Sequence, residues 1–379
     1  MEAFLIAGIG IGAFMFFLLI FKKEKQLGDF LFLSWILITL GQIAFYYYTI
    51  YIGEIQGILA IISFGLPLLG APVLFLYIFW LTGYRINWII STCHLSIYIV
   101  YVLLIFLLAS KSGTILTLKD GYFEFGDATP YWSNYYAIPL AISGLIYCIW
   151  GIWLLKKHRK SIDGLFSFKE KINLKWITYI VYAYFLLFVI ASFLIFGSSQ
   201  FHLLTVPKAF ALVGISLCLM LVSFGFFALR QTAIFSNVDI SKFSYDGIKN
   251  HAVDKSNYSK SGLSLDKIQS LAIQLQDYMI HEKPYLNENL TLPMLAEKLK
   301  ISPSNLSQVI NQHFENNFYD FINAYRIELA KEMIVSGDYS HLTILGIAFD
   351  CGFKSKSSFN RYFKKYTGIS PSQFKNSKN

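Results

Sequence analysis

The sequence predicts an all-α protein in two parts, a bundle of seven membrane-spanning helices followed by a cytoplasmic domain with two helix-turn-helix units. Three observations support this prediction. Of the 379 residues, 55% are hydrophobic and only 15% are charged, which is more apolar than a soluble core of this size requires. Seven apolar stretches reach the ~20 residues that cross a hydrocarbon core. Beyond Arg230 the sequence turns polar, and two similar short helical patterns follow.

The apolar stretches are separated by short polar connections, as in a multi-pass membrane domain. They lie near Phe4–Phe21, Phe30–Tyr51, Ile58–Leu81, Trp88–Ala109, Tyr135–Leu155, Trp176–Phe196 and Ala209–Leu229. In the third stretch Pro67 and Pro72 each remove a backbone donor, so we expect the helix to kink there. We assign residues 1–230 to a seven-span domain and interpret it as a sensor.

The basic residues of the connections predict the orientation, because cytoplasmic loops retain Lys and Arg. The first, third and fifth connections carry eleven Lys and Arg residues, whereas the second, fourth and sixth carry three. This asymmetry places the N-terminus outside and everything after Arg230 in the cytoplasm. The first stretch lacks the features of a cleaved signal peptide, because its basic cluster follows the apolar run. We therefore expect a multi-pass protein of a bacterial inner membrane.

The spans contain almost no ionisable side chains, which argues against a transporter, since transport sites usually place charges within the membrane. His94 is the exception in the fourth span, and we interpret it as structural. No HExxH helix or other catalytic constellation is present in the sequence, and the four cysteines lack metal-ligand spacing. We therefore expect no catalytic residues, no metal and no cofactor. Polar side chains within two spans could contact a ligand, namely Gln42, Tyr46, Tyr47 and Tyr48 in the second and Tyr182 and Tyr184 in the sixth. Interhelical hydrogen bonds explain them equally well.

Polar residues dominate from Ser236 to Ser264, so residues 231–264 are interpreted as a flexible cytoplasmic linker. Apolar residues then recur at three- and four-residue steps from Leu265 to Met279, which predicts a helix that Pro284 ends. This helix is a candidate for dimerisation or signal transmission. Positive charge increases toward the end of the chain, where residues 351–379 contain seven Lys and Arg and no Asp or Glu. Such a basic block is typical of a surface that binds phosphate.

The first helix-turn-helix unit is predicted at about residues 291–314. Thr291 is positioned to cap one helix, and Ser302 followed by Pro303 begins the next. Small Ala296 would lie where the two helices cross. The second helix would bury an apolar face and present amide and hydroxyl groups on the other, which are the groups that hydrogen-bond base edges in a major groove.

The same pattern recurs at about residues 343–365. Thr343 is positioned to cap a short helix, Gly352 permits a sharp turn, and a second helix begins near Ser355. Ala348 occupies the place of Ala296 in the first copy. Between the copies, Phe318 to Met333 has the apolar spacing of a long amphipathic helix, which would hold the two units at a fixed separation.

The segments LAEKLKISPSNLSQVINQHF, FINAYRIELAKEMI and GFKSKSSFNRYFKKYTGISPSQFK closely resemble the AraC/XylS family of bacterial regulators. The resemblance covers roughly residues 265–375, and its signature includes Gly352, Phe359, Phe363, Gly368 and Pro371. It implies a homeodomain-like tandem domain over residues 265–379 whose recognition helices, here Pro303–Phe314 and Ser355–Lys365, enter successive major grooves ~34 Å apart. Many relatives carry a soluble sugar-binding barrel at the N-terminus, so their ligands are not implied for this chain.

The candidate DNA contacts lie on the two recognition helices. They are Ser304, Asn305, Ser307, Gln308 and Asn311 on the first and Lys356, Ser357, Asn360, Arg361, Lys364 and Lys365 on the second. Arg361, Lys364 and Lys365 suit phosphate contacts, which position the protein, and Arg361 also suits base reading, as do Asn305, Gln308, Lys356, Ser357 and Asn360. A solvated helix face is the alternative interpretation of the basic group.

The combined pattern predicts a membrane-bound transcription regulator that couples a stimulus at the membrane or outer face to promoter DNA. The expected partners are double-stranded DNA, the lipid bilayer, RNA polymerase and an unidentified small-molecule or membrane-derived signal. A homodimer is compatible with the pattern but is not required, because each chain has two recognition helices. The alternatives are a membrane receptor whose cytoplasmic domain binds a protein partner, and a transporter or membrane enzyme with an accessory domain.

Overall fold

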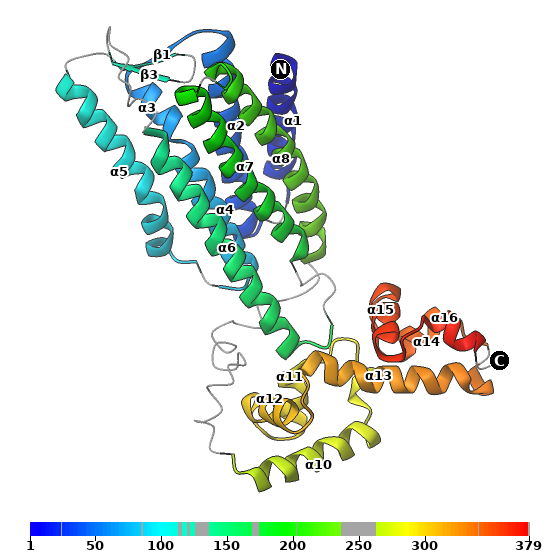
Figure 1. Ribbon diagram of the computed structural model, residues 1–379. Helices are drawn as coiled ribbons and strands as arrows, with labels where there is room; N and C mark the ends of the chain where they lie inside the picture. The colour runs from blue at the N-terminus through cyan, green and yellow to red at the C-terminus, as the bar shows by residue number, and fades with distance from the viewer. Residues whose placement is uncertain are drawn as a thin grey trace. The chain divides into compact units, whose positions relative to one another are not determined.

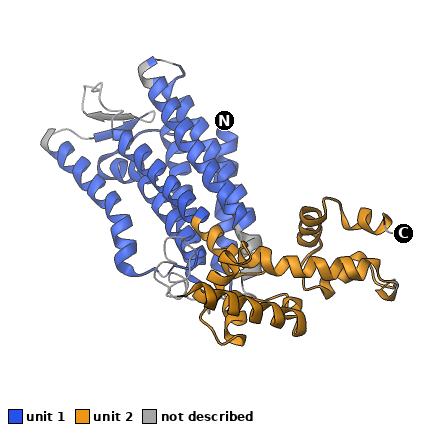
Figure 2. Ribbon diagram, turned by 60° about the horizontal axis from the view of Figure 1, so that its bottom comes forward, with its two compact units in different colours: residues 1–156, 174–242 blue, residues 157–173, 243–379 orange. Residues whose placement is uncertain are grey.

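Figure 1 shows a computed structural model of the chain. It describes residues 1–379 except Glu24, Arg85, 113–115, 120–121, 126–135, 169–173, His202, 236–262, Ser340 and 378–379. The described residues are organised in helices with one small sheet, so the predicted all-α class is confirmed. They form two compact units, residues 1–156 with 174–242 and residues 157–173 with 243–379 (Figure 2).

The first unit is a helical bundle (Figure 1). Its helices are α1 (Glu2–Ile20), α2 (Leu27–Tyr51), α3 (Gly57–Gly65), α4 (Pro67–Leu81), α5 (Trp88–Ser112), most of α6 (Ile138–Leu165), α7 (Lys175–Phe201) and α8 (Val206–Phe235). When α3 and α4 are taken together, the described residues contain seven segments long and apolar enough to cross a membrane. Each corresponds to one of the seven predicted stretches, and α6 continues past the predicted end at Leu155 into the basic residues that follow.

The third span is interrupted at the first of its two prolines. Leu66 separates α3 from α4, and Pro67 occupies the first position of α4, where its missing N–H costs nothing. Pro72 lies inside α4, which continues through it. An interruption therefore lies at Pro67, whereas α4 continues through Pro72 and the kink expected there stays a prediction.

The bundle has an aromatic interior and an apolar exterior. The ring centroids of Trp35 and Phe32 lie 4.7 and 4.8 Å from that of Phe224, and Tyr77 completes the group at 5.7 Å. Many large apolar side chains on the outside are exposed, including Trp88 with 76% of its surface accessible. A soluble protein rarely exposes so much contiguous apolar surface, whereas a helix facing lipid does so without cost.

A small antiparallel sheet was not predicted. Its strands are β1 (Ile55–Gln56), β2 (Leu116–Lys119) and β3 (Tyr122–Phe125), in the order β1-β2-β3. Ile55 pairs with Leu118, and Thr117 pairs with Glu124. The sheet connects the α2–α3 turn to the long α5–α6 connection.

The second unit contains the C-terminal helices. They are α10 (Leu265–His281), the short helix η4 (Pro284–Leu286), α11 (Leu292–Lys298), α12 (Pro303–Gln312), α13 (Phe318–Val335), η5 (Gly337–Tyr339), α14 (Ile344–Asp350), α15 (Lys356–Thr367) and α16 (Pro371–Asn376). One core lies among α10, α11, α12 and the start of α13, and another lies among the end of α13, α14 and α15.

Two further predictions concern α10 and the linker before it. The apolar face of α10, including Ile268, Leu275 and Met279, is buried in the first of these cores. That face is therefore used within the chain, whereas a role of α10 in dimerisation or signal transmission stays a prediction. The predicted flexible linker, residues 231–264, lies mostly outside the described residues, apart from the end of α8 at Phe235 and the two residues before α10.

Candidate DNA-binding interface

The first helix-turn-helix unit is formed by α11 and α12. The Thr291 side chain accepts a hydrogen bond from the Met294 N–H, and the Ser302 side chain accepts one from the Asn305 N–H, so both helices begin at the predicted caps. Ala296 is completely buried, as expected for a small residue between two crossing helices. The recognition helix ends at Gln312, two residues before the predicted end.

The second unit, α14 and α15, repeats this local chemistry. Thr343 caps α14 by accepting from the Gly346 N–H, and Ser355 caps α15 by accepting from the Ser358 N–H. Ala348 is completely buried like its counterpart. The second recognition helix extends to Thr367, and Gly368 ends it in the left-handed conformation.

The turns of the two units share one backbone motif. The Ile301 N–H donates to the Ala296 carbonyl at 3.0 Å, and the Phe353 N–H donates to the Ala348 carbonyl at the same distance. Such a six-to-one bond requires a left-handed residue just before its donor. Lys300 occupies that position with φ 54°, and Gly352 occupies it with φ 86°. The repeat therefore extends from side-chain caps to backbone geometry.

We expect Gly352→Ala to destabilise the second unit by about 2–3 kcal/mol, because a left-handed non-glycine residue costs roughly 1–2 kcal/mol and the added methyl also meets backbone. A Cβ at this position would lie 2.6 Å from the Tyr285 carbonyl oxygen and 2.8 Å from that of Leu286. Urea dependence of hydrogen exchange in α14 and α15 measures the loss. Lys300→Gly is the matched control, since it relieves the same strain and should leave exchange equal or slower; equal stability of both variants would contradict the argument.

The predicted contacts on α15 lie together on its accessible side. Lys356, Ser357, Arg361, Lys364 and Lys365 are exposed, Asn360 is half-buried, and Phe359, Tyr362 and Phe363 point into the core. The helix thus separates a basic polar face from an aromatic one. This arrangement permits the exposed polar residues of α15 to contact DNA, which remains a prediction.

On α12 the structure corrects part of the expected face. Ser304, Asn305 and Asn311 are half-buried, but Ser307 and Gln308 retain only 4% and 3% of their surface. Ser307 borders the core face beside Ile310, and the Gln308 amide donates to the Gln312 side chain at 3.2 Å. The Asn311 amide donates to the Ser307 carbonyl and hydroxyl at 2.7 and 3.2 Å. The expectation that Ser307 and Gln308 are exposed is therefore wrong.

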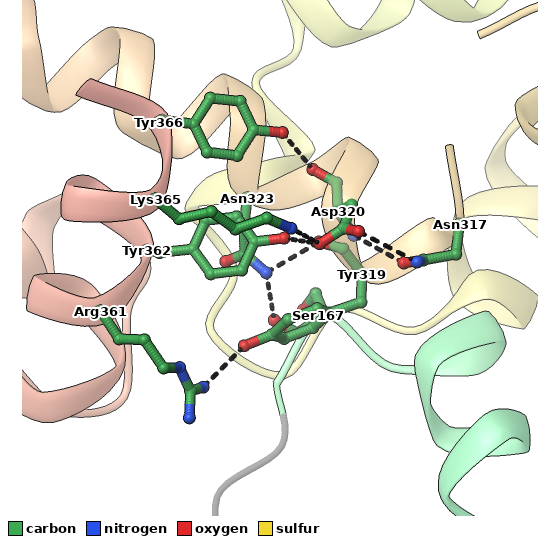
Figure 3. A network of polar contacts seen from close by, with 9 residues as sticks. All are labelled: Ser167, Asn317, Tyr319, Asp320, Asn323, Arg361, Tyr362, Lys365 and Tyr366. Atoms are coloured by element: carbon green, nitrogen blue, oxygen red, sulfur yellow. Dashed lines mark hydrogen bonds and ion pairs between the residues drawn. The ribbon is translucent and has the colours of Figure 1, made fainter. Parts of the chain in front are cut away.

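Asp320 at the start of α13 connects that helix to the second recognition helix (Figure 3). Its carboxylate accepts hydrogen bonds from the Tyr362 hydroxyl and from Lys365 Nζ, the latter at 3.0 Å, and Asn317 Nδ2 donates to it at 3.1 Å. The Tyr366 hydroxyl donates to the Asp320 carbonyl. Burial, with added repulsion from Asp320 and Glu328, raises the pKa of Tyr366, which keeps this hydroxyl protonated as a donor.

Arg361 is also positioned from α13. Its Nη2 donates to the Tyr319 hydroxyl at 3.2 Å while the rest of the side chain stays accessible (Figure 3). A guanidinium held at one edge keeps other donors for a carboxylate, phosphate or guanine partner. The helix α13 thus fixes both the orientation of α15 and that of Arg361.

Two neighbouring lysines of α15 differ in whether they form an ion pair with Asp320. Lys365 is ion-paired with it, whereas among the described residues Lys364 has no ion pair. Each phosphate contact contributes about 0.9 to the slope of log affinity against log salt. We expect Lys364→Met to lower that slope by about one and Lys365→Met to lower it clearly less, because the Lys365 charge is already compensated. Titration of a defined promoter fragment at several salt concentrations measures both slopes, and equal decreases would refute the distinction.

Arg326 is 1% exposed and hydrogen-bonds three separate segments of the second unit. Its Nε donates to the Tyr285 carbonyl at 2.7 Å, and Nη2 donates to the Asn287 carbonyl at 2.8 Å. Nη1 donates to the Ser167 carbonyl at 3.1 Å, and Nη2 also reaches Ser167 Oγ at 3.2 Å. Three chain segments distant in sequence therefore meet at one guanidinium.

Ser167 belongs to a short segment that follows α6 and packs on the C-terminal helices. Its N–H and Oγ both donate to the Leu290 carbonyl, at 3.2 and 2.7 Å, just before the Thr291 cap. Phe166 forms an antiparallel bridge with Thr291. Lys354 Nζ, in the turn of the second unit, lies 3.5 Å from the centroid of the Phe168 ring. Residues 166–168, which we call the docking segment, thus contact both helix-turn-helix units.

Sequence reasoning missed Asp320, Arg326 and the docking segment. A signal existed for Arg326, because it lies four residues after Ile322 and three before Leu329, on the apolar face of an amphipathic helix. A charge at such a position is buried only if it is fully paired. No local signal marks Ser167, since its partners are more than 120 residues away in the chain.

Two capped helix pairs, joined by one helix and repeated in backbone detail, define a tandem helix-turn-helix domain of the AraC type at the C-terminus. Residues 295–377 match the family described as a helix-turn-helix domain. The resemblance stated from the sequence is thereby confirmed for this part of the chain.

Relatives with similar sequence are helix-turn-helix regulators. An uncharacterised HTH-type transcriptional regulator of Staphylococcus aureus is 33% identical over 131 residues, covering 28% of this chain and 17% of the relative. The uncharacterised HTH-type transcriptional regulator YtdP of Bacillus subtilis is 28% identical over 101 residues, covering 27% and 12%. The chain spans less than a fifth of the length of these curated relatives.

Among solved structures, the C-terminal domain of the two-component response regulator yesN from Fusobacterium nucleatum is 30% identical. The match covers 28% of this chain and 98% of that domain, with a TM-score of 0.25.

Proposed function

We propose that the chain is a transcription regulator resident in the bacterial inner membrane. Its seven spans hold the N-terminus outside, and its C-terminal domain binds promoter DNA in the cytoplasm. A stimulus at the membrane or outer face alters DNA binding or the contact with RNA polymerase. The tandem helix-turn-helix domain supports the DNA partner, and the basic asymmetry of the connections supports the orientation.

One observation carries the link between membrane and DNA. The docking segment follows α6 directly in the chain, yet its hydrogen bonds are made to Leu290, Asn323 and Arg326 of the DNA-binding domain. These residues lie at the entry to the first unit and in the helix between the two units. A change in the segment would therefore act on the spacing of both recognition helices and give two states that differ in DNA binding.

The DNA partner is tested with the full chain in lipid nanodiscs and sheared genomic DNA. Bound fragments are sequenced as salt is raised through the range that removes non-specific phosphate contacts. We expect a few sites with a common motif to be retained. Uniform, salt-sensitive retention would overturn sequence-specific binding and favour a protein partner.

The coupling is tested by Ser167→Pro, which removes the N–H and Oγ that donate to Leu290. We expect this variant to retain the same genomic sites, while expression of the adjacent genes becomes constant across growth conditions in which the wild type varies. The control is Ser270→Ala, a mild change at an exposed position of α10. Proline is not used there because it would disrupt the helix. Expression that still varies in the Ser167→Pro strain would show that the docking segment does not carry the signal.

A further inference from the structure

The first unit contains a cavity of about 410 Å³ that is lined by five segments of the bundle and open on one side. Its wall is formed by α2 at Gln42 to Tyr46, by the α3–α4 break, by Ala137 and the start of α6 as far as Ala141, by α7 and by α8. This volume lies within the range of sites for small organic ligands, about 300–1,000 Å³. We propose that the cavity binds an uncharged, largely apolar small molecule with a carbonyl or similar oxygen acceptor.

The lining excludes a charged ligand. Among the described residues that line it there is no Asp, Glu, Lys, Arg or His, and most are Phe, Leu, Ile, Val or Ala. A charge within an apolar bundle requires a partner, because neither lipid nor aliphatic side chains solvate it. The few polar side chains are Gln42, Tyr46, Ser63, Tyr184 and Ser192.

Gln42 is the reason for expecting a hydrogen-bond acceptor on the ligand. Its side chain is 3% exposed, and its Nε2 has no hydrogen-bond partner among the described residues. Donors in a membrane interior have no water to bond, so they favour a ligand oxygen.

Gly70 on α4 lies beside Tyr184 and Gln42, two of the polar residues that line the cavity. A Cβ at this position would lie 3.1 Å from the Tyr184 hydroxyl and 3.4 Å from Gln42 Nε2. The hydroxyl and the amide therefore approach one point on α4 from two other helices. A ligand oxygen in the cavity beside Gln42 accepts a hydrogen bond from its Nε2, while the remaining ligand contacts Phe188, Phe210 and Leu217.

The exposed rim indicates the route of entry. Ile138 on α6 and Phe193 and Phe196 on α7 line the cavity but remain 43%, 65% and 50% exposed. These side chains belong to the apolar exterior that a bilayer would cover. An apolar ligand therefore enters from the acyl region of the membrane rather than from water.

The cavity borders α6, the helix that leads to the docking segment. The inference that follows deepens the proposed function and rests on it. Ala141 lines the cavity, and the same helix ends at Leu165, about 36 Å further on at 1.5 Å per residue, immediately before the docking segment. The α3–α4 break and α6 both border the ligand, so binding is able to bias their packing. The ligand would thus be the stimulus.

The test uses the full chain in nanodiscs and a photoactivatable probe, a dodecanoate methyl ester with a diazirine in its chain. Probes with the same chain but a carboxylate or trimethylammonium head are the charged counterparts. Mass spectrometry of cross-linked peptides locates each probe. We expect saturable labelling by the ester at residues 137–141 and 187–196, displaced by unlabelled ester and at least tenfold weaker for the charged probes.

Two variants examine the site, and a third is the matched control. Ala141→Trp fills the cavity and should abolish labelling, while Gln42→Leu keeps its shape and should weaken ester binding about fivefold to tenfold through one lost hydrogen bond. Ala183→Trp fills a neighbouring groove of about 310 Å³ on α7 and α8 and should leave labelling unchanged. If Ala141→Trp fails to fold, Gln42→Leu decides the outcome.

Non-saturable labelling, equal labelling by all three probes, or labelling unaffected by Gln42→Leu would overturn the ligand site. Genomic DNA retention is measured on the same nanodisc preparations. Lost labelling with retained DNA sites would reject the cavity alone and leave the regulator intact. Specific labelling without any DNA site would support the cavity and reject the proposed function.

Discussion

Replacing Arg326 by methionine is expected to destabilise the DNA-binding domain by about 3–5 kcal/mol, a large part of the 5–15 kcal/mol that holds a typical domain folded. Methionine fills similar space but donates nothing, so the buried Tyr285 carbonyl loses its partner. The carbonyls of Ser167 and Asn287 each lose one of two donors and keep Asn323 Nδ2 and the Leu290 N–H. Unsatisfied buried acceptors cost about 1–3 kcal/mol each, and the losses are not fully additive.

The measurement is hydrogen exchange of α11, α13 and α14 in the full chain as urea is raised. Arg326→Lys keeps the charge but lacks the planar fork, so it should be intermediate. Arg361→Met, at an exposed arginine, is the matched control and should change exchange by less than about 0.5 kcal/mol. Wild-type exchange in Arg326→Met would show that the carbonyls find other partners and that the site does not hold the segments together.

Reversing two charges on the second recognition helix, Arg361→Glu with Lys364→Glu, should weaken DNA binding about a hundredfold or more. Hydrogen bonds to charged groups contribute roughly 1.5–3 kcal/mol each, and two of them correspond to at least that factor. Both side chains are exposed, and neither belongs to the buried core of α15, so folding should be preserved. The salt slope should fall by about two.

Affinity is measured with fragments recovered from the genomic selection, at several salt concentrations. Lys267→Glu with Lys331→Glu gives the same change in net charge on α10 and α13 and serves as the control. An equal loss in both double variants would mean that overall charge, rather than the α15 face, governs binding. Full retention in the α15 variant would count against this helix as a DNA contact.

The sequence determined the local elements well because their signals are local. Caps at Thr291, Ser302 and Thr343 depend on a side chain and an N–H three residues later, and the structure contains all three bonds. Span lengths follow from the thickness of a membrane, so the seven apolar helices were found to within a few residues, apart from the extended end of α6. The accessible face of α15 followed from helical periodicity.

Tertiary structure decided what distant segments share. Burial of Ser307 and Gln308, the Asp320 connection to α15 and the use of the α10 apolar face depend on packing that no window of sequence contains. Ser167 meets Arg326 across 159 residues, and such a contact leaves no periodic trace in either segment. The cavity likewise exists only where five segments of the bundle fail to fill the space between them. Short-range hydrogen bonds and the length of an apolar stretch depend on neighbouring residues, so the sequence predicts them. Shape complementarity between elements arises only when the elements are assembled.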